Sequence, residues 1–152
     1  MLEGRHYQNA YVTRNIAKWI EHFQTHAEVR KLITYEGSVE VRTPAGGVTQ
    51  TSKLAFIWVG DLQYELIEPI SGAKLFSDAL PNDDSLRFHH ICNRVDDWDS
   101  FRARVDRQPY PVVLERGGEE LKFLYLDARA FLGHYLEYVW APQKLWEQMG
   151  GR

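Results

Sequence analysis

Several features of specialised proteins are scarce or missing in this 152-residue chain. There is one cysteine, Cys92, so neither an intrachain disulfide nor a thiolate zinc site is expected, and a reducing cytoplasm is the expected location. No apolar run reaches the ~20 residues of a membrane-spanning helix. The first five residues are too short and too polar for a signal peptide. We therefore expect neither a membrane-spanning helix nor a signal peptide.

Basic runs are also missing, and the net charge is −3, so nucleic acid is not an expected partner. The hydrophobic fraction of 44% and the aromatic fraction of 13% instead indicate a folded globular protein. The length suits one domain or two fused halves of about 60–70 residues. A half of that size buries too little surface to be stable alone, so two halves would share a core.

A strand followed by a helix occurs twice. In the first copy a strand at 7–13 precedes the N-cap candidate Asn15 and an apolar helical stripe, formed by Ile16, Trp19, Ile20 and Phe23. In the second, a strand at 88–95 precedes the N-cap candidate Asp97 and a stripe formed by Trp98, Phe101 and Val105. A shift of 82 positions superimposes Asn15 on Asp97 and places Gln8 on His90. This pattern predicts an internal repeat.

Three further strands are predicted after each helix, so each half has the order β-α-β-β-β. They cover 31–35, 54–59 and 62–67 in the first half, and 111–115, 121–126 and 135–139 in the second. The expected organisation is a first module at 1–70, a linker at 71–86, a second module at 87–141 and a C-terminal tail at 142–152. Short helices are expected within 73–80 and 143–149. The polar stretch 37–52, with Pro44, Gly46 and Gly47, predicts a long loop or a loose hairpin that serves as a mobile lid.

Two carboxylates stand in the middle of apolar strands, Glu65 in the first half and Glu137 in the second. A buried carboxylate is costly unless it is paired or bound to a metal. The alternative is that both point to solvent from a half-exposed sheet. Strand alternation places Gln8 on one face with Ala10 and Val12, and His90 on one face with Cys92 and Arg94.

Four short segments, at 7–16, 62–69, 88–97 and 133–139, resemble in sequence and in order the glyoxalase/bleomycin-resistance/extradiol-dioxygenase superfamily, also called the vicinal oxygen chelate superfamily. They are spread through both halves, so the resemblance extends over nearly the whole chain. The resemblance implies an α+β fold of two βαβββ modules that form a curved mixed β-sheet around a metal site. Carried over to this sequence, the metal ligands are Gln8, Glu65, His90 and Glu137. Their order is similar to that of glyoxalase I, and His and Glu in the second half are similar to methylmalonyl-CoA epimerase.

This donor set is borderline to hard, which suits one divalent ion of zinc, nickel, cobalt, manganese or iron. The ion and the two carboxylates sum to zero charge, so a developing oxyanion can be accepted. With Glu65 and Glu137 as catalytic proton carriers, the expected function is a glyoxalase-like isomerase, epimerase or lyase that transfers a proton next to a carbonyl.

Two other functions are left open: a metal-free binding or resistance protein, and an extradiol-type dioxygenase. Extradiol enzymes use two His and one Glu, and Glu65 stands where the second His would be. The expected partner is a small-molecule substrate, without nucleic acid or membrane, and we expect a homodimer whose site lies within one chain or across the interface.

Other residues compete for these roles. A strand slip of two residues would replace Gln8 by His6, and a register change would replace Glu65 by Glu68. His89 is expected to turn away from the site and to be structural, and His134 to be peripheral. His22 and His26 are expected on a solvated helix face, and Cys92 is expected to be a small core residue.

Overall fold

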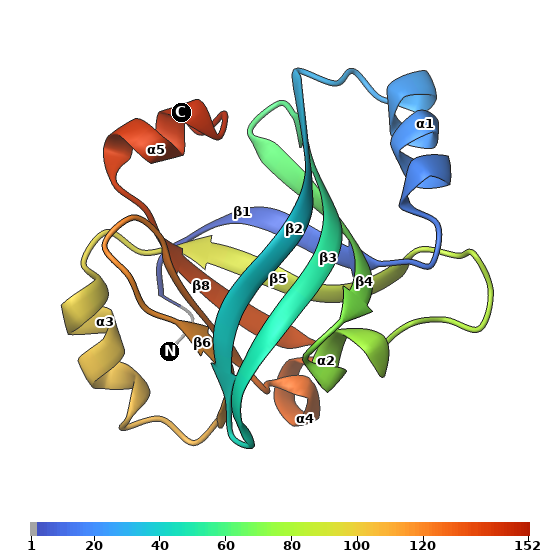
Figure 1. Ribbon diagram of the computed structural model, residues 1–152. Coiled ribbons are helices and arrows are strands. Elements are labelled where there is room, and N and C mark those ends of the chain that lie inside the picture. The colour runs from blue at the N-terminus through green and yellow to red at the C-terminus, as the bar shows by residue number, and fades with distance from the viewer. Residues whose placement is uncertain (1–2) are drawn as a thin grey trace.

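Eight strands form a closed barrel in the computed structural model, which describes residues 3–152 (Figure 1). Around the barrel the strands follow the order β1-β4-β3-β2-β6-β7-β8-β5. Their bounds are β1 Arg5–Val12, β2 Lys31–Thr43, β3 Gly46–Val59, β4 Leu62–Ser71, β5 Arg87–Arg94, β6 Val112–Arg116, β7 Lys122–Leu126 and β8 Tyr135–Trp140.

The two halves of the chain have the same strand pairing. In each half the first strand lies parallel to the last, β1 beside β4 and β5 beside β8, and the other neighbours are antiparallel. The halves join where β1 pairs with β5, and at the single register pair Arg42–Glu115 between β2 and β6. The predicted α+β fold with a curved mixed sheet is confirmed. The exact module boundaries stay a prediction.

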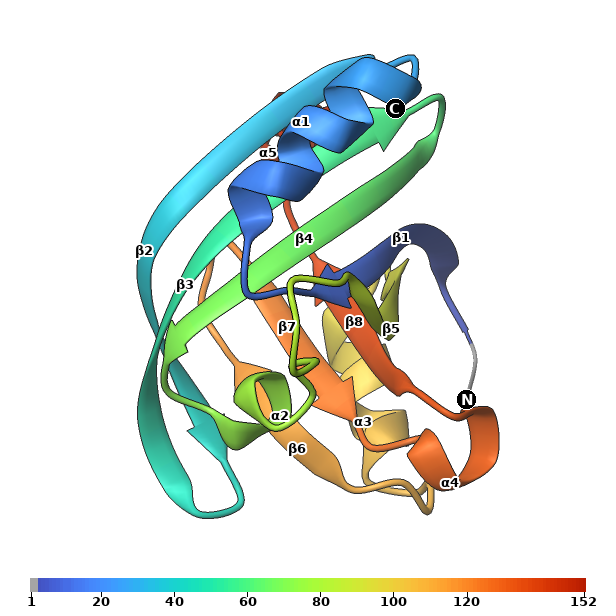
Figure 2. The same ribbon diagram turned by 90° about the vertical axis from the view of Figure 1, so that its right-hand side faces the viewer.

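Helices lie outside the sheet and at its ends (Figure 2). Both predicted N-caps are confirmed: Asn15 Oδ1 accepts from Lys18 N at 3.2 Å, and Asp97 Oδ1 accepts from Ser100 N at 3.0 Å. Of the five helices in the described part of the chain, α4 is not predicted by the sequence, because its four residues have no recognisable cap or stripe. The bounds are α1 Ile16–His26, α2 Lys74–Ser77, α3 Trp98–Val105, α4 Arg129–Leu132 and α5 Gln143–Gln148.

The segment 37–52 is not the long loop that its composition suggests. It belongs to the β2–β3 hairpin, whose strands pair continuously from Lys31–Trp58 to Thr43–Gly46. Val41 is buried on the inner side, while polar residues alternate with it on the outer side. The long-loop alternative is therefore wrong, and the hairpin alternative is correct; the mobility of this segment as a lid stays a prediction. Its length lets β2 reach β6 and close the barrel.

Two apolar clusters fill the barrel. One includes Phe76 of α2 and Tyr125 of β7, and the other includes Tyr7, Cys92 and Trp146 of α5. The helices α2 and α5 lie at opposite ends of the barrel (Figure 1). Polar groups occupy the layer between the two clusters, and these form the candidate site. In residues 3–152, no helix combines the length and hydropathy needed to cross a membrane.

Candidate metal centre

Register places the predicted ligands in two neighbouring rows on the inner face of the barrel. In the first row, Ala10 of β1 lies between Glu65 of β4 and His90 of β5. Laterally paired residues share a face of the sheet. The short side chain of Ala10 therefore leaves room in which Glu65 and His90 approach each other.

The second row contains Gln8 and Glu137. Gln8 pairs with Gln63 and Cys92, and Cys92 pairs in turn with Glu137 of β8. The β1–β5 register shifts between His6 and Gln8, which marks a bulge. Because of this bulge, both Tyr7 and Gln8 are buried, where simple alternation would turn one of them outward.

Glu65, His90 and Glu137 meet at one point. Each offers a ligand atom, and these atoms all lie within 4.8 Å of one another. His90 Nε2 lies 3.0 Å from Glu137 Oε2 and 3.6 Å from Glu65 Oε2. Glu65 is 7% exposed, His90 0% and Glu137 8%. Both carboxylates are thus buried, and the solvent-facing alternative is wrong.

This arrangement is unfavourable for two anions alone. Burial first, and then the nearby Glu137 carboxylate, raises the pKa of Glu65 well above its ordinary value. Burial likewise raises the pKa of the Tyr7 and Tyr125 hydroxyls, and the two carboxylates add to that shift. A divalent cation between the carboxylates would offset both the burial and the repulsion.

Gln8 carries a buried amide in the adjacent row. Its Nε2 donates to Gln63 Oε1 at 2.6 Å, but its own Oε1 is buried and has no hydrogen-bond partner among residues 3–152. A buried acceptor that is left unpaired costs about 1–3 kcal/mol, so an unpaired amide oxygen in this layer is consistent with a ligand position. An amide oxygen, two carboxylates and an imidazole fit a divalent ion of the zinc, nickel, cobalt, manganese or iron type.

His89 controls the proton on His90. His89 Nε2 lies 2.9 Å from the Leu75 carbonyl oxygen, so this nitrogen carries a proton and donates it. Burial, with a smaller effect of His90, lowers the pKa of His89 to about 3, so the ring is neutral and Nδ1 is an acceptor. His90 Nδ1, at 2.8 Å, therefore donates to His89 Nδ1. With its proton on Nδ1, His90 can present the Nε2 lone pair to a metal ion.

The competing residues lie elsewhere. His6 is exposed, and its Nε2 lies 3.1 Å from the Gln8 carbonyl oxygen and 2.8 Å from Asn9 Oδ1. Glu68 Oε1 accepts from Ile16 N at 2.9 Å, so Glu68 caps α1. His22 and His26 stack on each other on the exposed face of α1. The Nδ1 atom of His134 lies 2.7 Å from the carbonyl oxygen of Tyr135, outside the cluster.

The sequence does not single out His89 and Tyr7 beside the centre, nor Arg94, which lies four residues beyond His90 on β5. Alternation turns His89 away from the ligands and predicts a structural role, although adjacent histidines on a buried strand are a usable signal. Simple alternation puts Tyr7 on the face opposite Gln8, because a bulge leaves no mark in the hydrophobic pattern. Alternation predicts that Arg94 shares a face with His90, but its burial at 8% exposure has no sequence signal.

The chain belongs to the Glyoxalase/Bleomycin resistance protein/Dioxygenase superfamily, whose sequence profile matches residues 7–125. The predicted family resemblance is confirmed. None of the curated protein sequences matches the chain.

Solved structures with the same fold include a hypothetical protein from Bacillus halodurans, 18% identical over 91% of this chain and 95% of that one, with a TM-score of 0.63. Methylmalonyl-CoA epimerase from Mycobacterium tuberculosis is 17% identical over 95% of each chain, with a TM-score of 0.59. The Streptomyces coelicolor methylmalonyl-CoA epimerase in complex with 2-nitronate-propionyl-CoA is 16% identical over 92% of this chain and 96% of that one, with a TM-score of 0.63. At these identities the likeness concerns the fold.

Proposed function

We propose that the protein is a divalent-metal-dependent isomerase or epimerase that transfers a proton at a carbon next to a carbonyl group. The observation that supports this most is the buried cluster of Glu65, His90 and Glu137, with the unpaired oxygen of Gln8 in the adjacent row. The fold that the chain shares with methylmalonyl-CoA epimerases is consistent with this class.

Gln8 Oε1, Glu65, His90 Nε2 and Glu137 would hold the ion. When bound, a divalent ion supplies Lewis-acid polarisation of a carbonyl or enolate oxygen. The chain supplies the proton transfer. Glu65 and Glu137 belong to different modules, on β4 and β8. In this proposal, one carboxylate takes the proton from one face of the substrate carbon and keeps it, and the other carboxyl group, which carries a proton of its own, delivers that proton to the opposite face, as an epimerisation requires.

The surrounding residues would keep the reacting carbon dry and the carboxylates aligned. Tyr7 and Tyr125 are buried, and their hydroxyls stay protonated because burial and the carboxylates raise their pKa. They can therefore donate hydrogen bonds to an oxygen that becomes negative during the reaction. His89 holds the ring of His90 through the Nδ1–Nδ1 hydrogen bond.

Two measurements on the purified protein test this proposal. Elemental analysis and calorimetric titration with zinc, nickel, cobalt and manganese should give about one ion per chain. A screen of 2-oxoaldehyde thiol adducts and acyl-coenzyme A epimers in heavy water should show deuterium entering next to a carbonyl. Glu137→Gln should lose exchange, and Glu120→Gln, an exposed matched control, should keep it.

The same measurements separate the other functions. A protein that binds small molecules without any metal and without exchange would be the binding or resistance protein. Oxygen consumption with catechols and iron(II) would indicate a dioxygenase. A homodimer and a cytoplasmic location stay predictions, and light scattering on the purified protein tests the first.

A further inference from the structure

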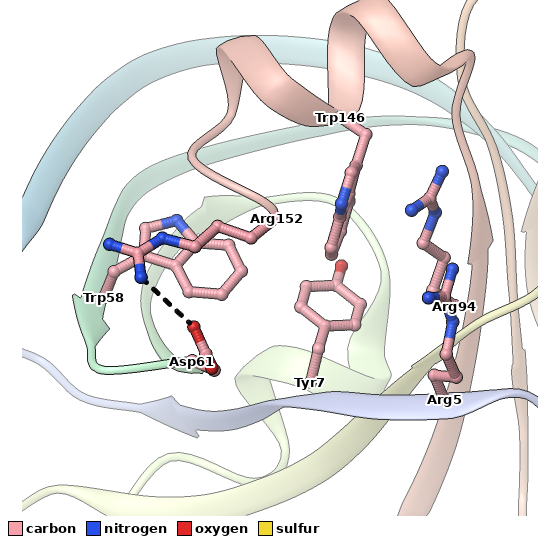
Figure 3. Close-up of a pocket in the computed structure, with 7 residues that line it drawn as sticks. All are labelled: Arg5, Tyr7, Trp58, Asp61, Arg94, Trp146 and Arg152. Carbon is pink, nitrogen blue, oxygen red and sulfur yellow. Dashed lines mark ion pairs between the residues drawn. The ribbon is translucent and has the colours of Figure 1, made fainter.

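A pocket of about 190 Å³ opens at the end of the barrel that α5 covers (Figure 3). Its aromatic walls come from β1, β3 and α5, as Tyr7, Trp58 and Trp146. Three arginines and one aspartate complete the lining: Arg5, Arg94, Arg152 and Asp61. The lining thus carries an excess of positive charge inside an apolar frame.

Arg94 is the buried member of this set, at 8% exposure. Its Nη2 donates to the neutral Gln143 Oε1 at 3.1 Å, and its guanidinium lies 4.4 Å from the centre of the Trp146 ring. Its Nε has no hydrogen-bond partner, and within residues 3–152 no carboxylate forms an ion pair with it. Asp96 acts on it only at longer range, and a buried cation without a direct ionic partner is costly, so this position favours an anion from outside the chain.

The other arginines are held only loosely. Arg5 pairs with Asp96 at 3.1 Å, but both side chains are well exposed. Arg152 lies 3.9 Å from Asp61, also at the surface. Exposed ion pairs of this kind contribute little, so either arginine can turn toward a ligand at small cost.

The pocket lies on the same inner face as the metal centre. Arg94 follows His90 by four residues on β5, which corresponds to roughly 13 Å along the strand. Arg5 pairs with Arg94 across the β1–β5 junction, so both belong to this face. Tyr7 separates the pocket from the centre: its ring lines the pocket, and its hydroxyl contacts Cys92 Sγ at 3.7 Å.

We propose that this pocket binds an anionic group of the substrate, a carboxylate or a phosphate, through Arg94 and its arginine neighbours. The inference rests on the proposed function, because it takes the metal centre to be where the substrate reacts. It defines the substrate as an elongated carbonyl compound whose anionic end lies roughly 13 Å from the reacting carbon, the rise along β5 from His90 to Arg94. Tyr7 and Trp146 would shift when such a molecule enters.

Malonate and inorganic phosphate are suitable probes, since each carries only the anionic group. Titration into the purified protein, followed by calorimetry and by the fluorescence of the pocket tryptophans, should show saturable binding of at least one of them. Arg94→Gln should weaken that binding by about tenfold or more, because it removes a charge-assisted hydrogen-bond donor. Arg107→Gln, which removes the same charge from an exposed position, should bind as the unmodified protein does.

The preferred probe distinguishes a carboxylate site from a phosphate site. The proposal is overturned if neither anion binds, or if Arg94→Gln binds both with unchanged affinity. Thermal unfolding of each variant checks that it is folded, and Arg94→Lys, which keeps a charge, should retain more affinity than Arg94→Gln. Metal content, measured on the same samples, tests the proposed function separately. A protein that binds metal but no anion contradicts only the anion pocket, whereas a protein that binds no metal contradicts the proposed function.

Discussion

Replacing His89 by Phe tests how the proposed metal centre is held together. The His89 ring stacks on Phe76 at 5.2 Å and on Tyr135 at 4.8 Å between ring centres. A phenyl ring keeps these contacts and most of the volume. It removes the nitrogen that accepts from His90 Nδ1 and the one that donates to the Leu75 carbonyl oxygen.

The cost follows from the hydrogen bonds that are lost. His90 Nδ1 would keep a proton with no acceptor in a site that is 0% exposed, which costs about 1–3 kcal/mol. In the metal-free variant, the proton of His90 can move to Nε2, which removes this cost. With a metal ion bound, Nε2 must be unprotonated to act as the ligand, so the proton stays on Nδ1 without an acceptor. The cost therefore lowers the affinity for metal. We therefore expect the affinity for zinc or cobalt to fall about 10–100-fold, as for other residues that orient a metal-ligating histidine.

Calorimetric titration of the metal-free protein measures this loss directly. His89→Asn should recover part of the affinity, because its side-chain oxygen can accept from His90 Nδ1. His22→Phe, a matched change on the exposed face of α1, should leave the affinity unchanged. If His89→Phe is folded and binds metal as tightly as the unmodified protein, His89 does not set the proton position on His90.

Three further predictions concern the centre and the fold. Glu137→Gln should fold normally, bind metal more weakly and lose exchange at the substrate carbon by about 10²–10⁴-fold; metal retained with full turnover would remove Glu137 from both roles. Chelation should lower the melting temperature, since an ion present at 100 times its Kd stabilises the fold by about 2.7 kcal/mol; an unchanged scanning-calorimetry midpoint would show that the barrel holds no ion. Gly72→Ala should destabilise the protein by more than about 1 kcal/mol in urea unfolding. Gly72 has φ +120°, and a Cβ would lie 2.8 Å from the Thr49 carbonyl oxygen, whereas Gly47→Ala, with no atom within 4 Å of its Cβ, should have little effect.

The sequence predicts the elements that depend on local chemistry. Asn15 and Asp97 are recognisable as N-caps because their side chains bond to the backbone three residues ahead. Glu65 and Glu137 stand out because a charge inside an apolar strand needs a special reason. The repeat then relates Gln8 to His90 without any knowledge of the fold.

Features that depend on contacts between distant parts of the chain cannot be predicted from the sequence pattern. The residues 37–52 look like a loop because only one face of the hairpin is apolar, and their strand character comes from pairing across β2 and β3. The bulge at Tyr7 changes which side chains point inward, but it has no composition signal. The role of His89 depends on the Leu75 carbonyl oxygen, which α2 brings to it from fourteen residues earlier in the chain.

The most direct test of the account is a crystal structure of the protein loaded with cobalt or zinc, with the ion located by anomalous scattering. The account predicts one ion inside the barrel, with Gln8 Oε1, Glu65, His90 Nε2 and Glu137 as ligands at about 2.0–2.3 Å. An ion bound elsewhere, or a centre in which Glu65 and Glu137 do not share the same ion, would contradict it.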